Sequence, residues 1–160
     1  MKIFCAKYLD ELSTQAKINP RQRQHRNIHY NYQESCQRLF NAIEPDSYIR
    51  PHRHSIDPKD ELLITIRGEI GLLIFNNNGD IIQALRFGSE KYGSGMAAGF
   101  EIPANTWHTV IALRSNCILL EIKSGPFDPN NPKELAPWAP EEGSTFAVNY
   151  LNQLAQKFLL

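Results

Sequence analysis

Two histidines separated by one residue, His52 and His54, lie just before a β-rich part of the sequence. Because side chains alternate between the two faces of an extended chain, both imidazoles are expected on the same side. Glu61 opens the next apolar run after a turn, and neutral imidazoles with one carboxylate form a ligand set that first-row transition metals accept. His108, which follows a strand-like run and a turn, is the candidate for a fourth ligand. The sequence therefore predicts a metal site.

A histidine pair at a strand end can also be a surface feature that binds nothing, because so short a motif carries little information by itself. The acidic residue that starts the next strand and the histidine that follows the turn after Pro103 add structural context that favours metal binding. Arg50 is expected on the histidine side of the chain. A guanidinium is permanently positive and cannot bind a cation, so Arg50 is predicted to bind substrate by pairing with a carboxylate or phosphate.

The composition is that of one ordinary globular domain, with 160 residues of which 42% are hydrophobic and 21% are charged. Lys plus Arg and Asp plus Glu number 17 each, so no overall field attracts nucleic acid or an anionic membrane. Three widely spaced cysteines argue against a disulfide framework and indicate a reducing compartment. No apolar run approaches the length of a membrane span or a signal peptide core. We therefore predict a cytoplasmic protein with a small-molecule ligand and no nucleic-acid or membrane partner.

Eight short runs rich in β-branched and aromatic residues predict strands, with turn-forming residues between them. Asn76 to Gly79 is typical of a hairpin turn, because Asn and Gly accept the positive φ that such turns need. The glycine-rich stretch 88–99 lacks the signature of a phosphate-binding loop and is interpreted either as a mobile loop over a site or as a plain surface loop. The pattern predicts an antiparallel sandwich or barrel with strands near residues 38–43, 48–54, 61–66, 69–75, 81–87, 100–103, 109–113 and 117–123.

Helices are expected only near the two ends of the chain, at residues 8–16 and after Ser144, where apolar residues recur at helical spacing. The polar run 21–26 is interpreted as a solvated connection, which leaves His25 and His29 on the surface. Five prolines between residues 125 and 140 favour an extended segment that wraps the domain, with Trp138 as its anchor. One domain is expected over residues 1–160, with a helical extension (1–35), a β-barrel (36–124) and a proline-rich wrap with a closing helix (125–160).

The order of the candidate residues resembles the two motifs of the RmlC-like cupin superfamily. The first motif is matched by His52, His54, Glu61 and Gly68, and the second by Pro103 and His108. The resemblance implies an all-β fold, the cupin double-stranded β-helix or jelly-roll barrel, with short N- and C-terminal helices. It also implies that the three histidines and the glutamate bind one metal ion.

The sequence departs from the usual motifs at two positions and in one spacing. Asp46 stands where a glycine is usual, and Asn105 replaces the glycine of the second motif, although Asn also tolerates left-handed φ. The spacer before Glu61 has six residues, where three or four are usual. Asp57, Asp60 or a water molecule could then take the place of Glu61.

Outside the two motifs, the chain resembles the WbuC-type cupin-fold metalloproteins. The similar segments are residues 37–42, 50–54 and 136–140, and the resemblance extends over residues 12–151. It implies a bacterial cytoplasmic protein encoded with surface-polysaccharide (O-antigen) genes, and so a role in lipopolysaccharide biosynthesis. The reaction of that family is not established.

Two main classes of function remain open. The first is a metal-dependent enzyme (an isomerase or epimerase, a lyase or a dioxygenase) that uses Fe, Mn, Ni or Zn on a small sugar-derived or other oxygenated anionic metabolite. The catalytic residues are unknown, and the candidates are Glu101, Glu121 and Tyr48. The alternative is a non-catalytic metal-dependent module that binds a sugar or metabolite, and a third possibility is a purely structural metal site. A homodimer is expected, since flat apolar sheet faces need cover.

Overall fold

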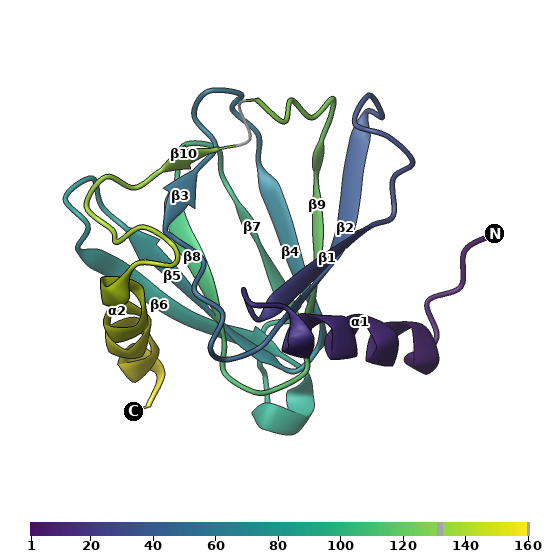
Figure 1. Cartoon of the computed structure of the whole chain (residues 1–160), viewed down its shortest axis with the longest axis horizontal. Coiled ribbons are helices and arrows are strands. Elements are labelled where there is room, and N and C mark those ends of the chain that lie inside the picture. Colours follow the sequence, from purple (N-terminus) through teal and green to yellow (C-terminus); the bar gives the residue numbers. More distant parts are fainter. Residues whose placement is uncertain (131–132, 160) are drawn as a thin grey trace.

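Two five-stranded antiparallel sheets make up most of the computed structural model, which describes residues 1–130 and 133–159 (Figure 1). The first sheet has the order β1 (Arg23–Asn27), β2 (Cys36–Ile43), β9 (Cys117–Ser124), β4 (Glu61–Arg67) and β7 (Gly99–Ile102). The second sheet has the order β10 (Glu134–Leu135), β3 (His52–Arg53), β8 (Trp107–Ala112), β5 (Glu69–Phe75) and β6 (Ile81–Gly88). This is the all-β jelly roll that the sequence predicts.

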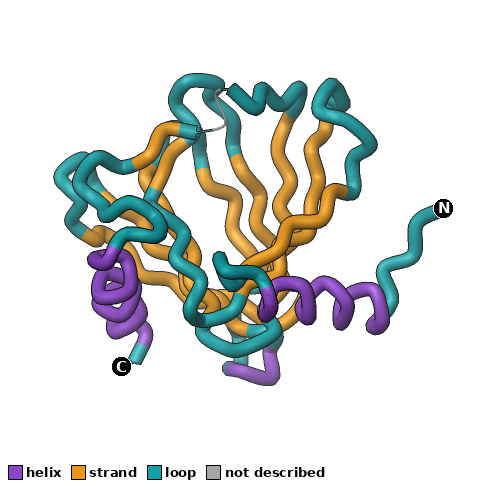
Figure 2. The backbone as a smooth tube through the Cα atoms, in the orientation of Figure 1, coloured by secondary structure: helices purple, strands orange, loops and turns teal. Residues whose placement is uncertain are grey.

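The two α-helices lie outside the sheets, near the two ends of the chain (Figure 2). They are α1 (Ala6–Ile18) and α2 (Thr145–Ala155), with short 3₁₀ turns η1 (Glu90–Tyr92) and η2 (Gln156–Phe158). The predicted apolar stripe of the closing helix is confirmed, because α2 and η2 pack on the outer face of the second sheet through Ala147, Leu151, Leu154 and Phe158. Gly71 on β5 allows this approach, since a Cβ there would lie 2.5 Å from the Phe158 ring. In the part of the chain that is described, no helix is long and apolar enough to cross a membrane.

The space between the sheets changes from apolar to polar along the strands. Side chains of a strand alternate between its two faces, so every second residue points inward. The inward series are Cys117, Leu119, Glu121 and Lys123 on β9, Ala112, Val110 and His108 on β8, and Leu63 and Glu61 on β4. The apolar members form the core, and the polar members lie together at the other end. The polar end is therefore built into the same strands that supply the core.

The structure corrects the interpretation of two segments. Residues 21–26 were expected as a solvated connection within a helical extension, but β1 forms there, and the whole of β1 pairs with residues 39–43 of β2. His29, expected on the surface, is only 6% exposed. β10 adds a two-residue strand to the proline-rich segment, of which residues 131–132 lie outside the described part of the chain. Neither β1 nor β10 has the apolar alternation of the other strands, so their sequences do not predict them. Each forms because its backbone pairs with a neighbouring strand.

The structure also shows the positions of Trp138, of the predicted hairpin turn and of the glycine-rich stretch. Trp138 packs on the second sheet, with its ring 5.0 Å from that of Phe75 and 6.2 Å from that of Trp107, as expected of an anchor. Gly79 has a φ of 90°, as the predicted hairpin turn requires. The glycine-rich stretch 88–99 contributes no residue to the cavity described below, so it is a surface loop away from that site.

Candidate metal centre

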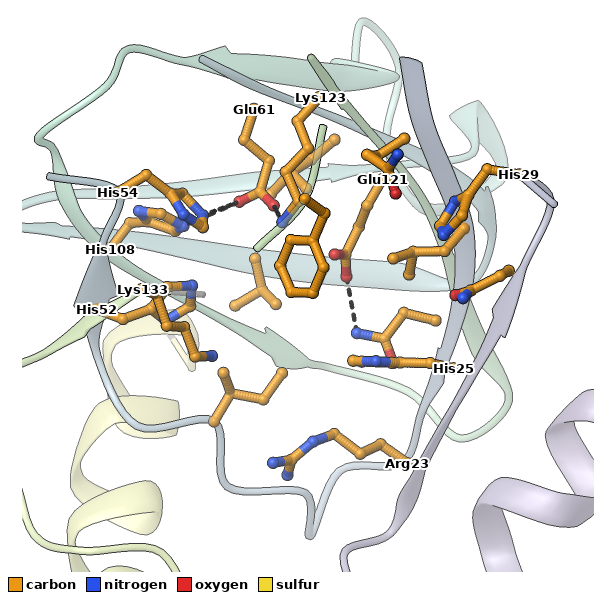
Figure 3. A pocket seen from close by; sticks show the side chains of 18 of the residues that line it. Arg23, His25, His29, His52, His54, Glu61, His108, Glu121, Lys123 and Lys133 are labelled. Atoms are coloured by element: carbon orange, nitrogen blue, oxygen red, sulfur yellow. Dashed lines mark hydrogen bonds and ion pairs between the residues drawn. The ribbon is translucent and has the colours of Figure 1, made fainter. Parts of the chain in front are cut away.

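Four side chains able to bind a metal meet where the two sheets approach each other (Figure 3). His52 on β3 lies directly opposite His108 on β8, and His54 follows β3 in the loop. Glu61 comes from the other sheet, as the first residue of β4. All four residues are buried, and their ligand atoms lie within 4.8 Å of one another. Two ligands of one ion can be up to about 4.2 Å apart, so small side-chain movements would place all four around one ion.

Hydrogen bonds to the backbone orient two of the imidazole rings. Nδ1 of His52 lies 3.0 Å from the carbonyl oxygen of Arg50, and Nδ1 of His108 lies 2.8 Å from that of Thr106. A carbonyl oxygen only accepts, so each Nδ1 carries a hydrogen and each Nε2 of the neutral ring keeps its lone pair. This arrangement is typical of metal-binding histidines, whose second nitrogen is fixed by a backbone or carboxylate oxygen.

Two further contacts fit a bound cation. Nε2 of His54 is buried without a hydrogen-bond partner and lies 3.6 Å from Oε2 of Glu61. Nε2 of His108 lies 3.2 Å from the same oxygen. When Nδ1 of His108 carries the hydrogen, its Nε2 and Oε2 of Glu61 are two acceptors that face each other. A cation bound by both atoms would satisfy them. The donor set of three imidazoles and one carboxylate therefore fits a first-row transition metal.

Electrostatics keep the cluster in the protonation states that bind a cation. Glu61 pairs with Lys123 across β4 and β9, with 3.1 Å between Oε1 and Nζ. Burial alone would raise the pKa of Glu61, but the Lys123 ammonium and the neighbouring imidazoles hold that pKa well below its usual value. Burial also lowers the pKa of His52 well below its usual value. An ionised carboxylate and a neutral imidazole are the forms that bind a metal.

The long spacer before Glu61 does not remove it from the cluster. Oδ1 of Asp60 accepts a hydrogen bond of 2.8 Å from the backbone N–H of Ala104, and Asp57 pairs with Lys59 near the surface. Neither aspartate belongs to the group of possible ligands. The extra residues form a loop that ends as β4 begins, and Glu61 keeps its inward position.

Asn105, which replaces the usual glycine, has the left-handed conformation that Asn tolerates, with a φ of 64°. Its backbone N–H donates to the carbonyl oxygen of His54 over 3.1 Å. The turn that contains Asn105 leads directly into β8, which carries His108. This hydrogen bond therefore ties together the two segments that supply His54 and His108.

The metal-binding cluster forms one wall of a cavity of about 250 Å³. The rest of the cavity is lined by polar side chains from β1, β2 and β9, by loop residues and by several apolar side chains. Lys133 also reaches into it (Figure 3), and among the described residues its amine has no hydrogen-bond partner. Burial lowers the pKa of Lys133 to about 8, so the amine is still largely protonated at neutral pH. The cavity thus joins a metal-binding wall to an unpaired positive charge.

The predicted general bases, Glu121 and Glu101, lie in different places. Glu121 lines the cavity, and its Oε1 accepts a hydrogen bond of 2.8 Å from Nδ2 of Asn41. Glu101 is exposed on β7 and does not line the cavity. The structure therefore leaves only Glu121 of this pair in reach of a ligand beside the metal-binding cluster.

Tyr48 and Arg50 do not line the cavity, so their positions do not support the roles that we predicted for them. The Tyr48 hydroxyl donates to the carbonyl oxygen of Pro140 over 2.9 Å, and burial raises the pKa of that hydroxyl. Nε and Nη2 of Arg50 both donate to the carbonyl oxygen of Ala136, at 3.1 and 2.8 Å. The prediction for Arg50 assumed strand alternation, but β3 begins only at His52.

Sequence reasoning missed several polar residues of the cavity. Arg23 and His25 lie on β1, whose polar sequence has no periodic signal, and Lys133 lies in the proline-rich segment. Asn41 lies on the predicted strand 38–43, and Gln37, which lies just before that strand, is an even number of residues away on the observed β2. Period two places them on the same face, and that face lines the cavity.

Glu142 holds the two arginines at the edge of the cavity. Nη2 of Arg23 lies 2.7 Å from both carboxylate oxygens, and Nε and Nη2 of Arg21 lie 2.6 and 2.9 Å from them. Nη1 of Arg23 also donates to the carbonyl oxygen of Tyr48 over 2.8 Å. These bonds connect β1 to the segment that precedes α2.

Acid should weaken the fold partly through Glu142. Burial would raise its pKa, but hydrogen bonds from Arg21 and Arg23 lower it to about 2, from an ordinary value of 4.5. A carboxyl group with a lower pKa in the folded state stabilises fully above its unfolded pKa, and this contribution is lost as the pH falls through its folded pKa. Urea unfolding of the wild type and Glu142→Gln should therefore show a difference in unfolding free energy that is constant near neutral pH and shrinks between pH 4.5 and 2. A difference that does not change over this range would contradict the prediction.

Comparisons with known proteins agree with this architecture. A family model described as "Domain of unknown function (DUF6016)" matches residues 4–87, and no curated protein matches the sequence. The structure of protein SO0799 from Shewanella oneidensis is similar with a TM-score of 0.54 and 10% identity, over 69% of this chain and 72% of that chain. The formate complex of oxalate decarboxylase from Lactobacillus farciminis is similar with a TM-score of 0.51 and 17% identity, over 69% of this chain but only 30% of that chain. At such low identity the likeness concerns the fold alone, and it supports the cupin jelly roll predicted from the sequence.

Proposed function

We propose that this chain, which belongs to the family described as "Domain of unknown function (DUF6016)", is a metal-dependent enzyme that acts on a small anionic, oxygen-rich metabolite. One observation carries the proposal: three histidines and a glutamate converge on one wall of a cavity of about 250 Å³. Four protein ligands leave room around a five- or six-coordinate ion for an oxygen of a substrate. Fe, Mn, Ni or Zn would suit this donor set.

The residues of the cavity suggest how such a substrate is handled. The chemistry that a bound metal ion supplies here is polarisation of a carbonyl or hydroxyl oxygen. Lys133 offers an unpaired ammonium to a carboxylate or phosphate of the substrate, the role that we first predicted for Arg50. Glu121 lines the same cavity and can accept a proton from a polarised substrate. Isomerisation, epimerisation and elimination all begin with such a proton transfer.

A sugar-derived substrate and a role in surface-polysaccharide (O-antigen) biosynthesis form the finer part of the proposal. They rest on the resemblance to the WbuC-type proteins in residues 37–42, 50–54 and 136–140. Two of these segments contribute to the cavity, since Gln37 and Asn41 come from the first, and His52 and His54 from the second. The homodimer and the cytoplasmic location expected from the sequence stay predictions.

Metal analysis followed by a turnover assay tests the proposal. Protein purified without a metal-affinity tag should contain about one transition-metal ion per chain, as one four-ligand cluster requires. The metal-loaded protein is then incubated with sugar acids and sugar nucleotides, and the products are followed by NMR. Product that disappears after chelation and returns when metal is added again supports an enzyme. Saturable binding without any product would replace the enzyme with a binding module, and the absence of bound metal would refute both.

A further inference from the structure

The cavity wall on the far side from the metal-binding cluster carries buried polar atoms that have no partner in the protein. Within residues 1–130 and 133–159, these atoms are Nε2 of His29, Oε1 of Gln37 and Oδ1 of Asn41. All three side chains line the cavity, and the residues are only 6%, 2% and 2% exposed. Figure 3 shows His29 across the cavity from His52 and His54. Because a buried polar atom without a partner destabilises the fold, three of them in one cavity indicate a ligand that satisfies them.

Hydrogen bonds determine which atom of each amide remains available. Nε2 of Gln37 donates to three backbone carbonyls of the preceding loop, those of residues 31, 32 and 34, at 2.8 to 3.4 Å. Nδ2 of Asn41 donates to a carboxylate oxygen of Glu121 over 2.8 Å. Carbonyl and carboxylate oxygens only accept, so both NH₂ groups are oriented toward these partners. The oxygens of Gln37 and Asn41 are therefore left as acceptors that need a donor from a ligand.

Nε2 of His29 can either donate or accept a hydrogen bond. Its Nδ1 lies 2.8 Å from the backbone oxygen and 3.0 Å from the backbone nitrogen of Arg38, so this nitrogen can donate or accept. Nε2 takes the opposite role in the neutral ring. A hydroxyl group both donates and accepts, so it matches Nε2 of His29 in either tautomer.

Strand pairing holds two of the three residues in place. Gln37 and Asn41 lie on β2, which is paired with β1 on one side and with β9 on the other. Gln37 is opposite Lys123 of β9, and Lys123 in turn is opposite Glu61 of β4. Three adjacent strands of one sheet thus connect the unpaired acceptors to the metal-binding cluster. The distance from Gln37 and Asn41 to Glu61 is therefore set by sheet geometry, whereas His29 lies in the loop between β1 and β2.

We propose that His29, Gln37 and Asn41 form a hydroxyl-binding subsite for a polyhydroxylated acid whose carboxylate end reaches the metal-binding cluster. This inference rests on the proposed function and specifies its substrate class. The two acceptor oxygens could also bind an ammonium group, but the charges of the cavity oppose this. Its lysines and arginines (Arg21, Arg23, Lys123 and Lys133) outnumber the carboxylates around them (Glu61, Glu121 and Glu142), even though Glu142 pairs with both arginines. Neutral hydroxyl donors therefore fit the subsite best.

Matched pairs of acids with and without hydroxyl groups test the subsite. D-gluconate and hexanoate have the same carbon chain, and D-glucuronate and cyclohexanecarboxylate are a cyclic pair. Isothermal titration of the metal-loaded protein should show that each hydroxylated acid binds at least about tenfold more tightly than its deoxygenated partner, because several hydrogen bonds to the subsite are then made and each contributes a few-fold in affinity. Equal affinities within both pairs, or no binding of any of the four acids up to their solubility limits, would overturn the inference.

Two variants test whether the preference for hydroxylated acids comes from the subsite. His29→Phe and Asn41→Leu should each weaken gluconate binding about three- to tenfold and leave hexanoate binding and metal content unchanged. Gln83→Leu, an amide removed from an exposed position of β6, is the matched control and should change neither affinity. If Asn41→Leu does not fold, His29→Phe decides. A full preference for gluconate in the folded variants would overturn the inference.

The results also separate this inference from the proposed function. A protein that binds metal and forms product but does not prefer hydroxylated acids would refute the subsite alone. A protein that prefers hydroxylated acids but holds no metal would refute the metal-dependent enzyme and leave the subsite in place.

Discussion

Replacing His108 with Ala should lower the affinity for a transition metal by more than about 100-fold and abolish metal-dependent turnover. Loss of an outer hydrogen-bond partner of a ligand already costs about 10- to 100-fold in metal affinity, and His108 is proposed as a direct ligand. Its ring is held on Nδ1 by the carbonyl oxygen of Thr106, and its Nε2 lies 3.2 Å from Oε2 of Glu61. The alanine variant removes the only proposed ligand on β8.

A second histidine of the same cavity is the matched control for this experiment. His25 lines the cavity but does not belong to the group of possible ligands, so His25→Ala should retain the metal. Metal content after dialysis and competition titration with a chelator give the two affinities, and circular dichroism checks the fold. If folded His108→Ala binds metal as tightly as His25→Ala, the metal centre is not where we place it.

Replacing Glu121 with Gln should slow turnover on the order of 100- to 10,000-fold and leave the metal content unchanged. A general base contributes about this much to a rate, and Gln cannot accept a proton. The side-chain oxygen of Gln can still accept the hydrogen bond that Nδ2 of Asn41 gives to Glu121, so the cavity wall should keep its shape. The effect should therefore appear in kcat and not in metal binding.

Glu101→Gln is the control for this variant, because Glu101 is an exposed glutamate on β7 outside the cavity. Both substitutions remove one negative charge, so a difference between them reports position and not net charge. Steady-state kinetics with the substrate found in the turnover assay provide the comparison. Wild-type kcat in Glu121→Gln, or equal losses in both variants, would remove Glu121 from the mechanism.

The sequence by itself predicted strands at or directly beside each proposed metal ligand, although His54 lies in the loop after β3. Period two placed His52 and His54 on one side of the chain, and the apolar runs after Glu61 and before residue 124 predicted the inner strands of the sheets. The motif spacing then indicated the jelly roll and the residues that meet in it. These properties are local or depend on a known motif, so they can be recognised without knowing which strands become neighbours.

Only the tertiary structure decided what surrounds the metal-binding cluster. Arg23 and His25 face the cavity because β1 pairs with β2, and their own polar segment gives no sign of a strand. Lys133 reaches the cavity because the proline-rich segment pairs with β3 through β10, whereas Arg50 is turned toward the carbonyl oxygen of Ala136 in that same segment. Alternation along a strand determines the face on which a side chain lies. The strand or loop opposite that face depends on pairing between distant segments, which packing of the whole chain selects.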